Sequence, residues 1–306
     1  TKASGELTVL LRHVQGCGGP GCLGLRQESN DTTLQSGSSA STKPVYDADQ
    51  VIHALTTRDG AQPSLAWGAD IISYSIGTGQ VDSTHNEYTS EMDGYVEMTA
   101  LMHAVAREAF ELWDELIAVD LHEMADWPDA HISFNYSSNT GGSTYTKYWY
   151  WEKDNQPRSD YRLADADLWF ADGWSTHDED SDLVPGSYGI MTYLHEIGHA
   201  LGVTHPGDYN GAATYETDAS HQQDTQQYTV MSYFRAGADG SGVDHEGAQG
   251  WSYGATPLLH DILAAQSAYG ADMTTRTGDT IYGFNSTAGR TAFDFTANTD
   301  PVVAIW

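Results

Sequence analysis

The segment HEIGHALGVTHP contains three histidines and a glutamate at spacings that suit a metal site. His195 and His199 are four residues apart, which places both imidazoles on one face of an α-helix. Glu196 projects nearby, where it can act on a metal-bound water. Gly202 lets the chain leave the helix sharply, so that His205 can return as a third nitrogen ligand. Three neutral imidazoles leave a zinc ion with one open position for water, as a catalytic site requires.

The specificity of this motif depends on its extended form. Two histidines with a glutamate between them also occur by chance, and the alternative is then a surface helix that binds no metal. The glycine and the third histidine at fixed distances make that alternative much weaker. Further along, the segment YTVMSYF contains Met231 and Tyr233. Met231 taken alone predicts core packing, because methionine fills irregular gaps.

The extended motif resembles the metzincin zinc signature. Pro206 follows the third histidine and the chain continues GDYN, which is similar to the serralysin group of secreted bacterial metalloproteases. The related astacin group usually has a glutamate at that position. The resemblance implies that Met231 forms an apolar floor under the three imidazoles. It also implies that Tyr233 is an additional zinc ligand, and that His195, His199 and His205 hold the ion.

The charge balance limits the classes of partner. The 306 residues include 43 acidic and 13 basic side chains, for a formal net charge of −30. Such a charge argues against nucleic acid or an anionic membrane as a partner. No apolar stretch reaches the roughly 18 residues that a membrane-spanning helix needs. We therefore expect a secreted, monomeric protein with a solvated acidic surface and polypeptide substrates.

The first 45 residues differ in composition from the rest. They are rich in Gly, Ser and Thr, and after a short apolar start they predict loop and edge structure. We assign residues 1–45 to an N-terminal extension. The only two cysteines, Cys17 and Cys22, lie within GCGGPGCLG. In an exported protein a small disulfide loop is favoured, with two free thiols as the alternative.

The strongest periodic signal predicts the helix that backs the site. Apolar residues recur at steps of three and four from Tyr95 to Leu116, which predicts a helix over about 91–118 that packs on a sheet. Ser90 with Asp93 resembles a capping box at its start. A short helix is expected to begin near Asp47.

Several segments predict strands. Residues 69–76, 131–137, 145–151 and 167–171 alternate or cluster apolar and aromatic side chains. The zinc helix then spans about 188–201. This order of elements resembles the metzincin fold, an α+β fold. It implies a twisted, mostly parallel sheet with an antiparallel edge strand, a long backing helix, an active-site helix and an irregular C-terminal subdomain. The run YTKYWYW is the candidate for the edge strand that pairs with substrate.

The C-terminal part has a second resemblance to serralysins. A helix is expected over 256–270, with Thr256 as its cap and Gly270 at its end, and it completes a catalytic domain of residues 46–272 whose cleft lies near 202–206. Residues 273–306 resemble the start of a calcium-binding β-roll domain. By that resemblance the carbonyls of Arg276, Gly278 and Thr280 supply half of a Ca²⁺ site. The repeat G-G-x-G-x-D does not occur, so the β-roll is either cut off or absent.

These residues together predict a secreted zinc endopeptidase. Glu196 would act as general base toward the attacking water, and Tyr233 would stabilise the oxyanion. One alternative is an astacin-like processing protease of narrow specificity, against which Pro206 argues. The other is a catalytically silent domain that holds zinc for binding, against which the intact chemical positions argue.

Overall fold

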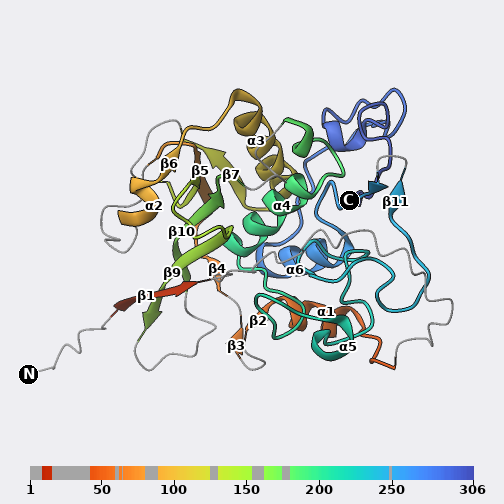
Figure 1. Ribbon diagram of the computed structural model, residues 1–306, viewed down its shortest axis with the longest axis horizontal. Coiled ribbons are helices and arrows are strands. Elements are labelled where there is room, and N and C mark those ends of the chain that lie inside the picture. Colours follow the sequence, from red (N-terminus) through yellow and green to blue (C-terminus); the bar gives the residue numbers. More distant parts are fainter. Residues whose placement is uncertain are drawn as a thin grey trace, which may run out of the picture.

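One large sheet organises the chain (Figure 1). The computed structural model describes residues 9–15, 42–58, 62–63, 65–79, 89–124, 130–153, 162–173, 180–247 and 250–306. The strands of the large sheet are β1 (Val9–Gln15), β4 (Ala66–Trp67), β5 (Ile71–Ile76), β6 (Tyr95–Val96), β7 (Asp120–Glu123), β8 (Ile132–Ser137), β9 (Tyr145–Lys153) and β10 (Arg162–Ala171). The helices are α1 (Ala48–Leu55), α2 (Thr89–Asp93), α3 (Ala100–Asp114), α4 (Tyr188–Ala200), α5 (Tyr215–Asp218) and α6 (Leu259–Tyr269).

The sheet is mostly parallel, as the α+β metzincin fold implies. Its strand order is β1-β9-β10-β8-β5-β7, with β4 beside β10 and β6 beside β8. Strands β4, β10, β8, β5 and β7 run parallel to one another, whereas β9 is antiparallel to β10. The two short hairpins, β2–β3 (Thr57–Arg58 and Gln62–Pro63) and β11–β12 (Glu246–Gly247 and Gly250–Trp251), lie outside this sheet.

The prediction that YTKYWYW forms the edge of the sheet was wrong. The run does form an antiparallel strand, β9, but β1 pairs with the free side of β9. The edge is therefore β1, which comes from the segment assigned to an N-terminal extension. The short apolar run at the chain start did not suggest a strand partner, because strand pairing between residues so far apart in sequence leaves no local pattern. Cys17 and Cys22 lie outside the described residues.

The predicted helix over 91–118 was also wrong in its extent. The structure divides this stretch into α2, β6 and α3, so Tyr95 and Met98 precede the long helix. Thr99 is the cap of α3 and accepts a hydrogen bond from the backbone N–H of Met102, whereas Ser90 lies inside α2. The apolar period continued across the break because Met98 is buried in the same core as the helix residues that follow it.

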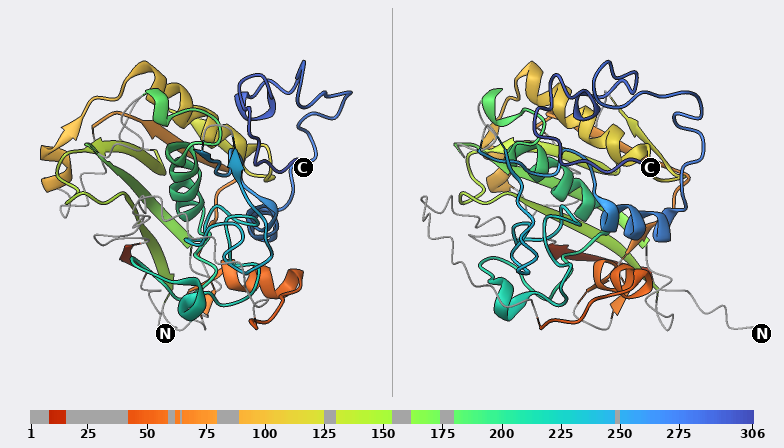
Figure 2. Two further views of the ribbon diagram at one scale, coloured as in Figure 1. Left: turned by 45° about the vertical axis from the view of Figure 1, so that its right-hand side comes forward. Right: turned by 90° about the vertical axis from the view of Figure 1, so that its right-hand side faces the viewer.

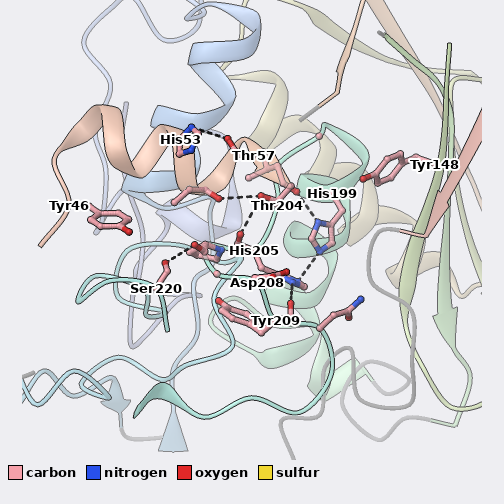
Figure 3. A pocket seen from close by; sticks show the side chains of 16 residues that line it. Tyr46, His53, Thr57, Tyr148, His199, Thr204, His205, Asp208, Tyr209 and Ser220 are labelled. Atoms are coloured by element: carbon pink, nitrogen blue, oxygen red, sulfur yellow. Dashed lines mark hydrogen bonds between the residues drawn. The ribbon is translucent and has the colours of Figure 1, made fainter. Parts of the chain in front are cut away.

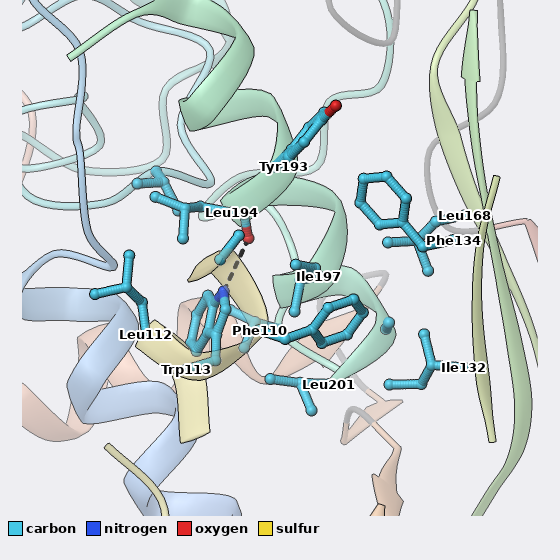
Figure 4. Close-up of a cluster of buried hydrophobic side chains, with 14 of the residues drawn as sticks. Phe110, Leu112, Trp113, Ile132, Phe134, Leu168, Tyr193, Leu194, Ile197 and Leu201 are labelled. Atoms are coloured by element: carbon cyan, nitrogen blue, oxygen red, sulfur yellow. Dashed lines mark hydrogen bonds between the residues drawn. The ribbon is translucent and has the colours of Figure 1, made fainter. Parts of the chain in front are cut away.

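Helices α3 and α4 pack side by side on one face of the sheet (Figure 2). Aromatic rings fill the space between these layers. The ring of Phe110 on α3 stacks on Tyr74 of β5 with centroids 3.9 Å apart, and Phe134 of β8 stacks on Phe170 of β10 at 4.3 Å. Figure 4 shows Trp113 of α3 among these side chains, donating its indole N–H to the Leu194 carbonyl of α4 over 3.1 Å.

Two shorter helices are close to their predicted positions. Helix α1 begins after Asp47, whose carboxylate accepts from the N–H of Gln50 over 3.0 Å. Helix α6 ends at Gly270 as expected, but it begins at Leu259, later than predicted. Thr256 is not its cap. The carboxylate of Asp261 accepts from the Leu258 N–H over 2.7 Å instead.

The segment after residue 272 has little regular structure and contacts α3 through ion pairs. Arg276 lies 2.5 Å from Glu115, and Arg290 lies 2.8 Å from Glu115 and 2.6 Å from Glu111. These ion pairs hold the C-terminal segment against the C-terminal end of α3. Among the helices that the structure describes, none combines the length and apolar character needed to cross a bilayer.

Candidate active site

The zinc-motif helix α4 runs through the interior of the protein. Ser187 caps it by accepting from the Ile190 N–H over 3.3 Å, and every residue from Gly189 to Ala200 is buried. The helix therefore carries His195, Glu196 and His199 into the core, away from bulk water. Burial on all sides explains why this helix has no polar face of the kind that surface helices show.

Gly202 turns the chain back after the helix. Its φ is +85°, a left-handed conformation that favours glycine. A Cβ at this position would lie 1.9 Å from the carbonyl oxygen of Leu65, so no other residue fits without moving the backbone. The turn brings His205 toward the two helical histidines, as the sequence predicted.

The three imidazoles converge with their Nε2 atoms facing one another. The Nδ1 atoms of His195, His199 and His205 each lie 2.8 Å from a backbone carbonyl oxygen, those of Val230, Val203 and Tyr209 respectively. Since a carbonyl can only accept, each Nδ1 carries the proton and each neutral ring has a lone pair at Nε2. Burial lowers the pKa of His195 to about 4, which keeps that ring neutral near pH 7.

This donor set fits a zinc ion. The Nε2 atoms of His199 and His205 are 3.1 Å apart, and those of His205 and His195 are 3.3 Å apart. These contacts are not hydrogen bonds, because neither nitrogen has a proton, and lone pairs so close repel unless a cation lies between them. Tetrahedral zinc with Zn–N bonds of about 2.0–2.1 Å requires nitrogens about 3.3–3.4 Å apart. Within the described residues, no second group of three potential ligand side chains converges in this way.

Glu196 lies fully buried beside the imidazoles. The Thr146 hydroxyl of β9 donates to its Oε2 over 2.7 Å, while Oε1 has no protein partner. Burial raises the pKa of Glu196 to about 8, and the hydrogen bond from Thr146 opposes that shift. A cation held by the neighbouring imidazoles would lower the pKa again and favour the carboxylate.

Met231 lies against α4, and Tyr233 lies beside His205. Met231 is fully buried under α4, and a Cβ on Gly198 would come within 2.8 Å of its sulfur. The ring of Tyr233 has its centroid 4.5 Å from that of His205. Burial, with a smaller contribution from the charge of Glu196, raises the pKa of the Tyr233 phenol well above its usual value. The phenol therefore stays protonated and can donate.

Buried carboxylates fix the chain around these residues. Asp261 of α6 accepts from the N–H of Val230 over 2.9 Å, and the carbonyl of Val230 is the partner of His195. Asp224 accepts from the Tyr209 hydroxyl over 2.8 Å, and the carbonyl of Tyr209 is the partner of His205. Each carboxylate thus supports one imidazole through one intermediate residue, an arrangement that is common around metal sites.

A cavity of about 520 Å³ opens beside His199 and His205 (Figure 3). Its walls come from α1, β9 and the turn after α4. In the close-up, His53 and Thr57 lie on one side of the cavity, and Tyr148 of β9 lies across from them. The cavity therefore extends from the imidazoles toward β9.

The structure brings together His195, Glu196, His199, His205, Met231 and Tyr233. It does not place the predicted Ca²⁺ residues near them, since Arg276, Gly278 and Thr280 belong to the segment that packs on α3. There the carbonyl of Gly278 accepts from the Thr280 N–H over 3.0 Å in a tight turn. Whether this turn binds calcium stays a prediction.

Sequence reasoning missed the supporting residues Thr146, Tyr209, Asp224 and Asp261. Thr146 lies within the YTKYWYW run and Tyr209 within the GDYN run that the sequence analysis singled out, so both were near a recognised signal. Asp224 and Asp261 have no motif spacing. A carboxylate within a largely apolar helix, as at Asp261, is the signal that could have been noticed, because a buried carboxylate needs hydrogen-bond donors.

Comparison with known proteins agrees with this geometry. Residues 82–233 match the family described as Matrixin, and residues 271–306 match the family described as Peptidase M10 serralysin C terminal. The chain is 33% identical over 283 residues to Metalloprotease AprA of Pseudomonas entomophila (strain L48), which covers 89% of this chain and 54% of the relative. It is 32% identical over 282 residues to Serralysin B of Dickeya chrysanthemi, with 88% and 54% covered.

A third relative, Metallopeptidase AprA of Pseudomonas marginalis, is 35% identical over 271 residues, with 86% of this chain and 54% of the relative covered. The chain spans about half the length of these curated relatives. One assignment follows from the two family matches and the three similar proteins. The mostly parallel sheet and the three converging imidazoles agree with it. The chain belongs to the serralysin-type metzincins, a group of zinc metalloendopeptidases.

Proposed function

We propose that this chain hydrolyses internal peptide bonds of polypeptides, with zinc held by His195, His199 and His205. The observation that carries this proposal is the convergence of three unprotonated imidazole nitrogens beside a buried carboxylate with one free oxygen. A zinc ion bound there supplies the Lewis acidity that activates water and polarises the scissile carbonyl. A purely structural zinc site would have no use for the carboxylate.

Glu196 is the general base in this proposal. Its Oε1, which has no protein partner, accepts the proton of the attacking water and then passes it to the departing amine. The Thr146 hydroxyl donates to the other carboxylate oxygen over 2.7 Å. The carboxylate therefore keeps one orientation while Oε1 accepts and releases the proton. The buried position of Glu196 excludes bulk water, which strengthens its hydrogen bonds to Thr146 and to the attacking water.

Tyr233 is the group that we assign to the oxyanion. Its phenol is protonated because burial raises its pKa, so it can donate to the oxygen that becomes negative in the tetrahedral intermediate. Its position beside His205 also allows it to be an additional zinc ligand before substrate binds. Met231 supports the site from below and takes no part in the chemistry.

The substrate is proposed to be an extended polypeptide that pairs with β9 on the side that β1 occupies in the structure. This strand contributes Thr146 to Glu196 and Tyr148 to the cavity, so a peptide along β9 passes the zinc-binding residues. We further propose that the protein is secreted and monomeric. Residues 273–306 would begin a C-terminal domain, with the carbonyls of Arg276, Gly278 and Thr280 available to Ca²⁺.

The variant Glu196→Gln tests the role of the base. The amide keeps the shape of the side chain but cannot accept a proton, so turnover of casein should fall about 10²–10⁴-fold. Zinc content measured by elemental analysis should stay the same. Glu216→Gln, which changes an exposed carboxylate on α5, is the matched control and should retain full activity.

Two outcomes would contradict the proposal. Proteolysis at the wild-type rate in Glu196→Gln would show that another group is the base. Casein digestion by the wild-type protein that persists after a chelator has removed all zinc would rule out metal-dependent hydrolysis.

A further inference from the structure

The first described strand of the chain lies along the strand that contacts the active site. Strand β1 pairs antiparallel with β9 over seven residue pairs, from Val9 opposite Lys153 to Gln15 opposite Lys147. Figure 1 shows β1 on the outer side of β9, at the edge of the sheet. The backbone groups on this side of β9 are therefore already paired.

The pairing extends to the position where β9 meets the catalytic residues. Val14 is opposite Tyr148, which lines the cavity with His199 and His205. Gln15 is opposite Lys147, the neighbour of the residue that donates to Glu196. Because paired strands lie about 4.8 Å apart, the C-terminal end of β1 runs directly beside the site.

We propose that β1 is a resident strand on the substrate-binding edge of β9 and that substrate must displace it. This inference rests on the proposed function, in which a polypeptide pairs with β9. A strand edge has one row of N–H and C=O groups and can accept only one partner there. The resident strand and the substrate therefore exclude each other along residues 147–153.

The sequence of β1 suits this role. The segment VLLRHVQ combines apolar residues with Arg12 and His13, while the chain as a whole has a net charge of −30. The single charge of Arg12 gives β1 a weak attraction to a protein of opposite net charge. Because β1 is covalently part of the same chain, it also competes at a high effective concentration. An extended peptide with similar apolar and basic residues is the partner that this edge fits.

Two truncations of the zinc-loaded chain test the inference. Deletion of residues 1–15 removes β1, whereas deletion of residues 1–8 keeps it and is the control. A resident strand that is in place about nine-tenths of the time raises the apparent KM about tenfold. Deletion of residues 1–15 should therefore lower the KM for an internally quenched peptide about tenfold, with kcat unchanged. Deletion of residues 1–8 should change neither constant.

Three further measurements support the test, and the first does not depend on the folding of the longer deletion. Leu11→Pro retains all other residues but disturbs the pairing of β1, and it should lower KM in the same direction. A synthetic peptide of sequence VLLRHVQ, added to the variant lacking residues 1–15, should inhibit it competitively. Backbone amides of β9 should exchange with deuterium faster in both β1 variants.

The outcomes separate this inference from the proposed function. If the full chain and both β1 variants cleave the peptide with the same KM, β1 does not compete with substrate and the inference is wrong, while the proteolytic function stands. If none of the zinc-loaded proteins cleaves any peptide, the proposed function is wrong, and displacement by substrate fails with it.

Discussion

The two halves of the active site are built in different ways. His195, Glu196 and His199 lie on α4, a regular helix embedded in apolar side chains against the sheet. His205 and Tyr233 lie in the stretch between α4 and α6, where regular elements are few and short. The helical half obtains its geometry from the helix period and from packing. The irregular half has no such period to rely on.

Buried polar groups take the place of regular structure in the irregular half. Backbone N–H groups outside helices and sheets need other acceptors when they are buried. Asp261 accepts from Thr229, Val230 and Leu258, and Asp224 accepts from Tyr209 and Ser232. The comparison teaches that stability should depend mainly on the helical half, and that metal affinity should depend strongly on the polar groups of the irregular half.

The largest effect is expected from Phe110→Ala in the helical half. Phe110 is fully buried and stacks on Tyr74, so its removal leaves a cavity and should lower the free energy of unfolding by about 3–5 kcal/mol. Denaturant titration measures this loss. Zinc affinity of the folded protein should stay within about twofold of wild type. A large loss of zinc affinity with little loss of stability would reverse the comparison.

Two buried histidines should make the protein sensitive to acid: His221 in the irregular half and His260 at the start of α6, beside it. Burial lowers the pKa values of His221 and His260 from 6.5 to about 4, and the His260 ring, at a centroid distance of 6.4 Å, further disfavours a charge on His221. The unfolded chain therefore binds protons that the fold does not. Stability is fully present above pH 6.5 and is lost as the pH falls toward 4.

The variant His260→Phe tests this origin of acid sensitivity. It keeps an aromatic ring stacked on Tyr228 but removes one titrating group. At pH 4 the buried His260 lowers the free energy of unfolding by on the order of 2–3 kcal/mol relative to pH 7. The free energy of unfolding of the variant should therefore fall less steeply from pH 7 to pH 4 than that of the wild type. His122→Gln, at an exposed position on β7, is the control from the other half. If the free energy of unfolding of His260→Phe depends on pH as in the wild type, another group causes the sensitivity to acid.

A smaller effect, confined to the metal, is expected from Asp261→Asn. The amide has one acceptor oxygen instead of two, so at least one of the groups that donate to Asp261, the Thr229 hydroxyl or the N–H groups of Val230 and Leu258, loses its acceptor and the segment around Val230 is held less well. The Val230 carbonyl then holds His195 less well, and the zinc dissociation constant should rise about 10–100-fold. Competition with a zinc chelator measures it. Asp279→Asn, at an exposed position, should not alter the affinity. Equal affinities in both variants would remove Asp261 from the support of the site.

The same division explains which predictions succeeded. The helix of the zinc motif and the turn at Gly202 were predicted correctly, because each follows from local spacing or from a short motif. The role of Met231 as a floor under the imidazoles stays a prediction. The long helix was misplaced because Met98 continued the apolar period without being helical. The start of α6 was misplaced because its cap is a side chain inside the helix, Asp261, rather than the residue before it.

The sequence by itself determined the candidate metal-binding set and, through its resemblance to serralysins, the family and the mostly parallel sheet that the family implies. The motif depends on residue type and on spacings of three or four residues, which are written in the chain. Only the tertiary structure decided that β1 covers β9, that Thr146 holds Glu196, and that Asp224 and Asp261 support the ligands. Such contacts join residues far apart in sequence, and their energies depend on burial and hydrogen-bond geometry that exist only once the chain has folded.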